Sequence, residues 1–267
     1  MKKYKIIILA IVMCCSIKIQ AQNTSATAAI TQTMQSIYQN YDSIKYLSFD
    51  VKFNYGSDTL LGKFDIEQMD GSYTMAGKRA KYRLGDIDFM QNDSFFIAVY
   101  NKDKLILVDE PKTINIGSQL PLRQQMDSLM LSYANQYTFS NFSQNTDTGV
   151  IQLLRADSSA QFDRFSISYD NRTKMLYSVS YEYAEPAELD SVVINRMMAS
   201  SVSTTPPMQK KRLTISFLNY RFDNYDKAVY DENNYIWFEN GVCKPTAKYD
   251  NFKIYYSKPV TNYIEQP

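Results

Sequence analysis

Hydrophobic and polar residues alternate along several stretches of this chain, beginning with LSFDVKFNY at residues 47–55. One set of alternate positions is Leu, Phe, Val, Phe and Tyr, and the other is Ser, Asp, Lys and Asn. Period two gives a β-strand one apolar and one polar face. The pattern recurs at residues 165–169 and 175–183. The apolar face must touch either the protein's own core or a bound molecule.

A different period occupies residues 24–44, where Thr24 or Ser25 offers an N-cap. Apolar side chains recur there at helical spacing. They are Ile30, Met34, Ile37, Tyr38, Tyr41 and Ile44. We expect an amphipathic helix that lies across a sheet.

Closely spaced strand signals follow, separated by short turns such as MDG, QND and NKD. Short connections between alternating runs indicate antiparallel hairpins. The expected strands are 46–55, 59–69, 72–84, 86–91, 94–100, 103–109, 136–143, 149–155, 162–169, 174–183, 212–222, 234–239 and 247–256. A second, short helix is expected over Leu122–Tyr133, and residues 184–211 are expected to be a long connector.

These elements predict an α+β fold in which a curved antiparallel sheet is covered by the N-terminal helix and the short second helix. No fixed-period repeat and no second composition regime divides the chain. We therefore expect residues 22–267 to form a single domain.

The first 21 residues have the features of a secretory signal peptide. Three lysines precede a twelve-residue apolar run from Ile6 to Ile17, which is shorter than the roughly 20 residues that a spanning helix needs. Cleavage is expected after Ala21. A lipid anchor at Cys15 is not expected, because Cys14 stands where a small residue is required. We expect a periplasmic or otherwise extracytoplasmic protein that does not span the membrane.

Composition then excludes several classes of chemistry. The chain has 29 basic and 28 acidic residues, and loss of residues 1–21 removes four lysines, which leaves a net charge of about −3. A net charge of this sign does not indicate a basic surface for binding nucleic acid. There is no histidine, which excludes Ser-His-Asp catalysis and His-ligated zinc. After cleavage Cys243 is the one cysteine, so no internal disulfide is expected.

Local stretches with chemical potential have simpler explanations. Asp86 and Asp88 would share one strand face, and the acidic stretch 223–232 could hold calcium loosely, but aspartates of this kind are usually turn or solvated residues. Alternate basic residues in KRAKYR (78–83) could contact an anion, although an exposed strand face is the preferred interpretation. We therefore expect no catalytic residue, no cofactor and no metal. A carboxylate enzyme ranks third among the functions considered.

The order of elements resembles that of the periplasmic lipoprotein carriers of the LolA and LolB type. The stretches that carry the resemblance are YLSFDVKFNYG, GKFDIEQMDGSY, GKRAKYRLG and FFIAVYNKDKLILV, with RLTISFLNYRFD as a late strand. Two features depart from the carrier pattern. The usual Arg-Pro pair is absent because Ala80 follows Arg79, and the C-terminal extension (residues 224–267) has no counterpart in the simple carrier.

The resemblance implies an incomplete β-barrel with an apolar cavity for acyl chains. It favours a non-enzymatic carrier or binding protein for lipids or lipoproteins in the bacterial cell envelope. The alternative is an envelope assembly or protein-interaction component without a ligand cavity, whose partners are other envelope proteins. The residues expected to line the cavity, with the phase between strands assumed, are Phe49, Val51, Phe53, Phe64, Ile66, Tyr82, Leu84, Phe95, Ile97 and Val99.

Overall fold

A computed structural model describes residues 27–58, 64–112, 134–186, 208–222 and 226–257. The predicted signal peptide, the predicted helix 122–133 and most of the predicted connector lie outside these described residues. The chain forms two compact units. Unit 1 comprises Met1–Asn40, Phe53–Gln68 and Leu122–Ser216, and unit 2 comprises Tyr41–Lys52, Met69–Pro121 and Phe217–Pro267. The single-domain organisation of residues 22–267 stays a prediction.

Fourteen strands are present among the described residues. They are β1 (Tyr46–Asp58), β2 (Phe64–Ala76), β3 (Arg79–Leu84), β4 (Ile87–Gln91), β5 (Phe96–Tyr100), β6 (Leu105–Asp109), β7 (Tyr137–Ser143), β8 (Thr148–Arg155), β9 (Arg164–Asp170), β10 (Leu176–Pro186), β11 (Met208–Arg221), β12 (Ile236–Glu239), β13 (Val242–Pro245) and β14 (Lys253–Tyr256). Short 3-10 helices are η1 (Ala134–Gln136), η2 (Lys227–Tyr230), η3 (Glu232–Asn234) and η4 (Ala247–Tyr249).

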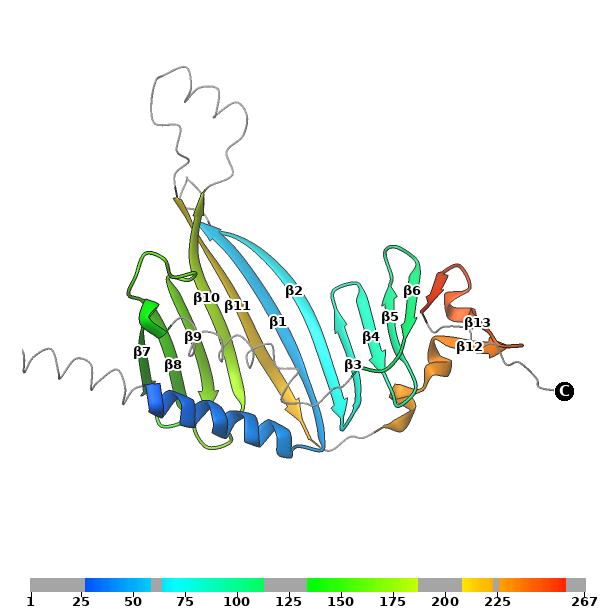
Figure 1. The fold of residues 1–267 in the computed structure, drawn as a ribbon, viewed down its shortest axis with the longest axis horizontal. Coiled ribbons are helices and arrows are strands. Elements are labelled where there is room, and N and C mark those ends of the chain that lie inside the picture. The colour runs from blue at the N-terminus through cyan, green and yellow to red at the C-terminus, as the bar shows by residue number, and fades with distance from the viewer. Residues whose placement is uncertain (1–26, 59–63, 113–133, 187–207, 223–225, 258–267) are drawn as a thin grey trace, which may run out of the picture. The chain divides into compact units, whose positions relative to one another are not determined.

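Twelve strands follow one another in the order β14-β6-β5-β4-β3-β2-β1-β11-β10-β9-β8-β7, and β12 pairs only with β13 (Figure 1). The order is open, with β7 and β14 at its ends. The neighbouring strands whose residue-by-residue pairing is defined run antiparallel, except β14 and β6, which run parallel. The predicted α+β class with an unclosed, mainly antiparallel sheet is therefore confirmed.

The N-terminal helix of residues 27–43 buries the predicted apolar stripe. Ile30, Ile37 and Tyr41 are fully buried, and Met34 is nearly so. In unit 1 the Asn40 Nδ2 donates to Met175 Sδ at 3.2 Å, and the helix packs beside the β7–β10 strands (Figure 1). The predicted helix on the sheet is confirmed. None of the helices in the described part of the chain is long and apolar enough to cross a membrane.

The core of unit 1 consists of cross-strand rows on one sheet face. Ile151 pairs with Ile167, which pairs with Val179, which in turn faces Ile215 on β11. All four side chains are buried. Rows of β-branched residues pack well on a pleated surface, so the alternation seen in the sequence produces this core directly.

The turn that the sequence predicts at residues 69–71 is wrong. Asp70 and Gly71 lie inside β2, and the hairpin turn comes at Gly77, whose φ is +60°. A Cβ on Gly71 would lie 2.7 Å from both the Arg83 carbonyl oxygen and Val51 Cγ2. Glycine is required at position 71 because two neighbouring strands approach it closely, and such glycines occur within strands as well as in turns.

The described part of the C-terminal extension is more irregular than predicted. The expected strand 234–239 becomes β12 in a hairpin with β13, joined through Asn240 and Gly241, which both have positive φ. The expected strand 247–256 begins late, because residues 247–249 form η4. Asp226 and Asp231 accept hydrogen bonds from the backbone N–H groups of Ala228 and Asn233 as caps of η2 and η3.

Substitution of the buried helix face tests its packing on the sheet of unit 1. Ile37→Asp places an unpaired charge at a fully buried position, and should lower the free energy of unfolding by about 3–5 kcal/mol. The matched control is Gln39→Asp, on the exposed side of the same helix. Thermal melting followed by circular dichroism measures both. Equal melting temperatures for the two variants would contradict the packing.

Candidate ligand-binding face

Five aromatic rings follow one another across neighbouring strands of unit 2. We call Phe49, Tyr73, Tyr82, Phe89 and Phe96 the aromatic ladder. Successive ring centroids lie 5.1, 5.2, 4.4 and 6.1 Å apart, and the first three pairs are stacked. Pairs of this kind contribute about 0.5–1.5 kcal/mol beyond the area that they bury.

Strand register places the ladder on one face. Tyr73 pairs with Tyr82, Tyr82 with Phe89, and Phe89 with Ala98. Phe96 lies two residues before Ala98 and therefore has the same orientation. The ladder is a consequence of two short turns that keep aromatic positions of β2, β3 and β4 in phase.

The opposite face of the same strands carries a closed core, which we call the covered face. Met90 pairs with Ile97, and Ile97 with Val108, and all three are buried. The C-terminal extension packs against them. The buried members of this cluster are Met90, Ile97, Val99, Ile106, Val108, Tyr235, Ile236, Tyr249 and Phe252.

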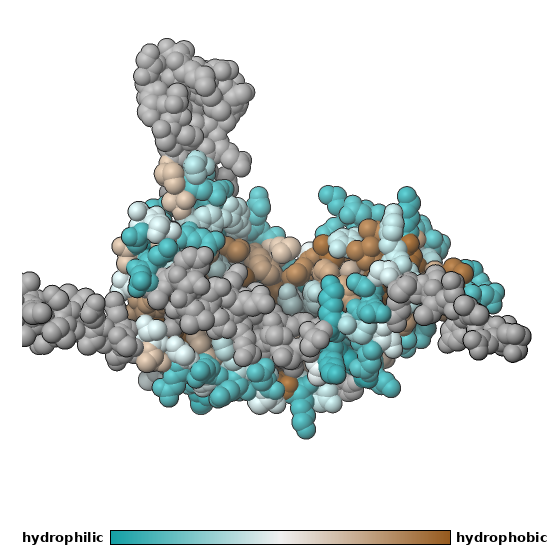
Figure 2. Space-filling model, viewed as in Figure 1, coloured by the Kyte–Doolittle hydropathy of each residue, from teal (hydrophilic) through white to brown (hydrophobic). Residues whose placement is uncertain are grey.

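The two faces differ in how far some of their large side chains are buried, although Phe49 and Ala98 on the ladder face are buried as well. Ile97 and Val99 on the covered face have no exposed surface, whereas Tyr82, Phe89 and Phe96 on the ladder are only half-buried. Figure 2 shows hydrophobic residues gathered over the region of β4–β6, with hydrophilic residues along its rim. An apolar sheet face that keeps part of its rings accessible is suited to contact with a hydrophobic molecule.

The residues expected to line a cavity divide between these faces. Phe49, Val51, Tyr82 and Leu84 have the orientation of the ladder, although Phe49 and Val51 are themselves 97% buried, with 3% exposed. Phe53 is half-buried, in the part of β1 that belongs to unit 1. Phe64 and Ile66 begin β2, and their side chains lie outside the described residues.

The remaining three expected residues do not join the ladder. Ile97 and Val99 belong to the covered face, and Phe95 packs against the same cluster, with its ring stacked 5.6 Å from that of Phe238. The assumed phase of β5 was therefore inverted relative to β3. The reason is local, because both parities of FIAVY are apolar, so alternation carries no information about the orientation of β5.

Tyr73, Phe89 and Phe96 are ladder residues that the sequence analysis missed. A signal for Phe89 was present in the two-residue turn Gly85–Asp86, which fixes the register of β3 with β4. Tyr73 was obscured by the turn wrongly placed at residues 69–71. For Phe96, no short-range signal distinguishes it from Ile97.

Basic residues of β3 face away from the ladder and form ion pairs. Arg79 pairs with Asp93, and Arg83 Nε lies 2.7 Å from Asp88 Oδ1. Asp88 is 9% exposed and also accepts from Asn101 Nδ2 at 2.9 Å. The Asp88 carboxylate, which was a candidate for acid–base chemistry, is thus held by Arg83 and Asn101 and has a structural role. Burial lowers the pKa of Lys81 on the same face.

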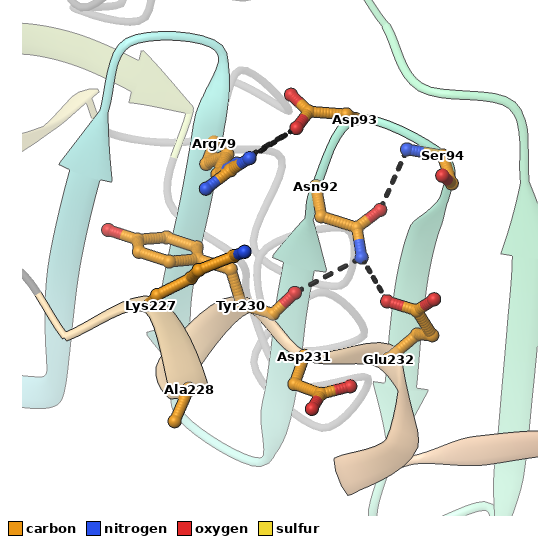
Figure 3. Close-up of a pocket in the computed structure, with 9 residues that line it drawn as sticks. All are labelled: Arg79, Asn92, Asp93, Ser94, Lys227, Ala228, Tyr230, Asp231 and Glu232. Carbon is orange, nitrogen blue, oxygen red and sulfur yellow. Dashed lines mark hydrogen bonds and ion pairs between the residues drawn. The ribbon is translucent and has the colours of Figure 1, made fainter.

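A polar hollow lies where the C-terminal extension meets the turn between β4 and β5 (Figure 3). At its centre the Asn92 side chain donates to the Tyr230 carbonyl at 3.1 Å and to Glu232 Oε2 at 2.6 Å. Its own oxygen accepts from the backbone N–H groups of Ser94 and Phe95. Asn92 therefore fastens the extension to the sheet, and we assign this hollow a structural role.

Metal and thiol chemistry find little support in the described part of the chain. No group of three or more Cys, Asp or Glu side chains there is arranged to hold a metal ion. Cys243 is half-buried, and burial raises the pKa of its thiol, which keeps it in the less reactive neutral form.

Burial also affects the ladder tyrosines. Desolvation, with a smaller contribution from Tyr82, raises the pKa of Tyr73 to about 12. Desolvation raises the pKa of Tyr82 as well. Both side chains are therefore neutral at physiological pH. The far end of the ladder carries a cation, because Lys112 Nζ lies over the Phe96 ring, 4.7 Å from its centroid.

No family model matches the chain, and no curated protein sequence matches it. Its structure is similar to those of several solved proteins. A DUF1329 family protein from Desulfovibrio piger covers 78% of this chain and 98% of its own, at 10% identity and a TM-score of 0.32. A LolA superfamily protein from Nitrosomonas europaea covers 75% and 98%, at 12% identity and a TM-score of 0.22.

The complex of MucA and MucB from Pseudomonas aeruginosa is a third similar structure. It covers 78% of this chain and 60% of its own, at 10% identity and a TM-score of 0.31. At TM-scores below 0.5 these likenesses decide nothing about function.

Removal of the Asn92 side chain tests how the extension is fastened. Asn92→Ala leaves Glu232 and the Tyr230 carbonyl without their donor, and should lower the free energy of unfolding by about 1–3 kcal/mol. Limited proteolysis should then cut within residues 226–234 sooner than in wild type. Asn233→Ala, which loses only a bond to Asp231 within the same turn, is the control. Equal cleavage rates in all three proteins would refute this role.

Alkaline unfolding tests the burial of the ladder. Because the pKa of Tyr73 is about 12 in the folded protein and 10.0 when exposed, its contribution is complete below pH 10 and is lost as pH rises through 12. The two-unit difference corresponds to about 2–3 kcal/mol. Tyr73→Phe keeps the ring and should reduce the loss of stability over this window, measured by denaturant unfolding at each pH. An unchanged profile would mean that Tyr73 is accessible to water.

Proposed function

We propose that this protein is an exported, non-enzymatic carrier or binding protein for a lipid, or for the acyl chain of a lipoprotein, in the bacterial cell envelope. The aromatic ladder is the wall against which the acyl chain lies. The observation that carries the proposal is the asymmetry within unit 2, where the covered face forms a closed core and the ladder face keeps half-buried rings.

The chemistry of the ladder supports an acyl chain as the occupant. Its rings are themselves uncharged and are stacked over three successive pairs, which gives a continuous aromatic row, and the Lys112 ammonium over Phe96 places one cation at its end. Each methylene removed from water against such a surface contributes about 0.8 kcal/mol. The tyrosine hydroxyls leave one polar end of each ring for a headgroup or for water.

A second function is favoured by a different observation. In unit 1 the β7 edge is uncharged, and an envelope protein could dock there without any lipid. The chain would then be an assembly or protein-interaction component.

Two matched substitutions of phenylalanine separate ligand binding from folding in unit 2. Phe89→Ala removes a ladder ring, and Phe252→Ala removes a ring from the covered-face cluster. The probe is a fluorescent fatty acid, displaced by unlabelled palmitate. Phe89→Ala should keep the cooperative melt and weaken binding about tenfold, which is about 1.4 kcal/mol. Phe252→Ala should lower stability by about 3–5 kcal/mol and leave the affinity of the folded fraction unchanged.

The opposite pattern contradicts the proposal. If Phe89→Ala and Tyr82→Ala both bind the probe as wild type does, the ladder is not the binding wall. If wild-type protein does not bind the probe at all, the carrier function is wrong and the interaction function remains.

A further inference from the structure

We propose that the outer edge of β7 in unit 1 receives an extended, uncharged peptide segment of another protein, which adds to the sheet as a strand. This inference concerns protein recognition and does not depend on lipid binding. The evidence is the backbone phase of β7, its composition and the hollow beside it.

Backbone hydrogen bonds fix which residues of β7 point outward. The Ala156 N–H donates to the Gln136 carbonyl at 2.8 Å, and the Gln144 N–H donates to the Thr148 carbonyl at 2.9 Å. Bonded and non-bonded pairs alternate in an antiparallel ladder. The even-numbered residues of β7 therefore bond to β8. Those that direct their N–H and C=O groups away from β8 are Tyr137, Phe139, Asn141 and Ser143.

Among the described residues β7 ends the strand order, so these outward groups form an open template. Proteins usually blunt such an edge with lysine, proline or a very short strand. The other terminal strand, β14, is four residues long and begins with Lys253. By contrast, β7 has seven residues, YTFSNFS, with neither charge nor proline. The edge of β7 therefore has what strand addition requires, which is a run of outward N–H and C=O groups without charged residues or proline.

A hollow of about 730 Å³ lies beside the first part of β7, where Tyr137, Thr138 and Phe139 line it. Thr138 and Phe139, whose side chains leave opposite faces of β7, both line it, as do Asn135 and Ala156 at the start of the strand. The N-terminal helix supplies the other wall through Thr31 and Gln35. None of the described lining residues is charged: they are Thr27, Ala28, Thr31, Gln32, Gln35, Asn135, Tyr137, Thr138, Phe139 and Ala156.

This lining specifies the occupant. A neutral wall gives a charged peptide no compensation for lost hydration, so an uncharged segment is preferred. The backbone groups of β7 supply affinity, and alternate side chains of the added strand meet Phe139 on one face and Thr138 on the other.

Hydrogen exchange of the protein alone is the first test. The amides of Phe139, Asn141 and Ser143 should exchange quickly, whereas those of Thr138, Ser140 and Phe142 should be protected by β8. Slow exchange of the outward amides would show that another segment of this chain or a second copy already occupies the edge, and would overturn the proposal.

The second test uses a fluorescein-labelled peptide of about eight residues in which threonine and valine alternate. Asn141→Pro removes one outward N–H, and Asn141→Ala loses the same side-chain bonds, to Thr33 and Tyr169, but keeps the N–H. Wild type and Asn141→Ala should bind the peptide in fluorescence anisotropy, and Asn141→Pro should bind about tenfold more weakly, the effect of one lost hydrogen bond.

A charge in the hollow gives a result that does not depend on proline. Thr138→Lys should weaken binding, whereas Thr138→Val, of similar shape, should not. A peptide that fails to bind wild type, or that binds the proline and lysine variants as tightly as wild type, would overturn the proposal.

Discussion

The arrangement of unit 2 depends on one constraint, which is that β5 is apolar on both faces. Phe96 and Ala98 point one way, and Ile97 and Val99 point the other. A strand of this kind must be covered twice, because each large apolar side chain gains about 1.5–3 kcal/mol only when it is removed from water. The C-terminal extension provides one cover through Tyr235, Ile236, Tyr249 and Phe252. The ladder face of β5 also needs a cover, and its rings are only half-buried. These half-buried rings are the basis of the proposed carrier function.

Much of the fold was predictable because its periodicity is strong. The apolar stripe from Ile30 to Tyr41 identifies the helix. In strands with one polar face, such as β9, the alternation of polar and apolar residues predicts which side chains are buried. Gly71 is an ambiguous signal in the sequence, because glycine occurs both in turns and where strands approach closely. Only the positions of Val51 and Arg83 distinguish the two cases. Local sequence could not show this, because those neighbours are distant in sequence.

For the candidate site, too, the orientation of a strand was predictable only where polar and apolar residues alternate. Tyr82 and Leu84 were oriented correctly because Lys81 and Arg83 alternate with them. Ile97 and Val99 lie on the opposite face of the sheet from Tyr82, against the assumed phase between the strands. No polar residue distinguishes the two faces of β5, and the extension that buries Ile97 and Val99 has no periodic signal pointing to β5. The uncharged edge of β7 was visible in sequence as YTFSNFS, but its terminal place in the strand order was not.

Two surfaces with different chemistry result, each within its own unit. The ladder offers aromatic rings, and the edge of β7 offers backbone groups beside a neutral hollow. The central claim is that the two faces of β5 differ in function. Nuclear Overhauser contacts between a ¹³C-labelled fatty acid and the protein measure this directly. The account predicts contacts from acyl methylenes to the rings of Tyr82, Phe89 and Phe96, and none to the methyl groups of Ile97 and Val99. Contacts to those methyl groups, or no contact to any ladder ring, would contradict it.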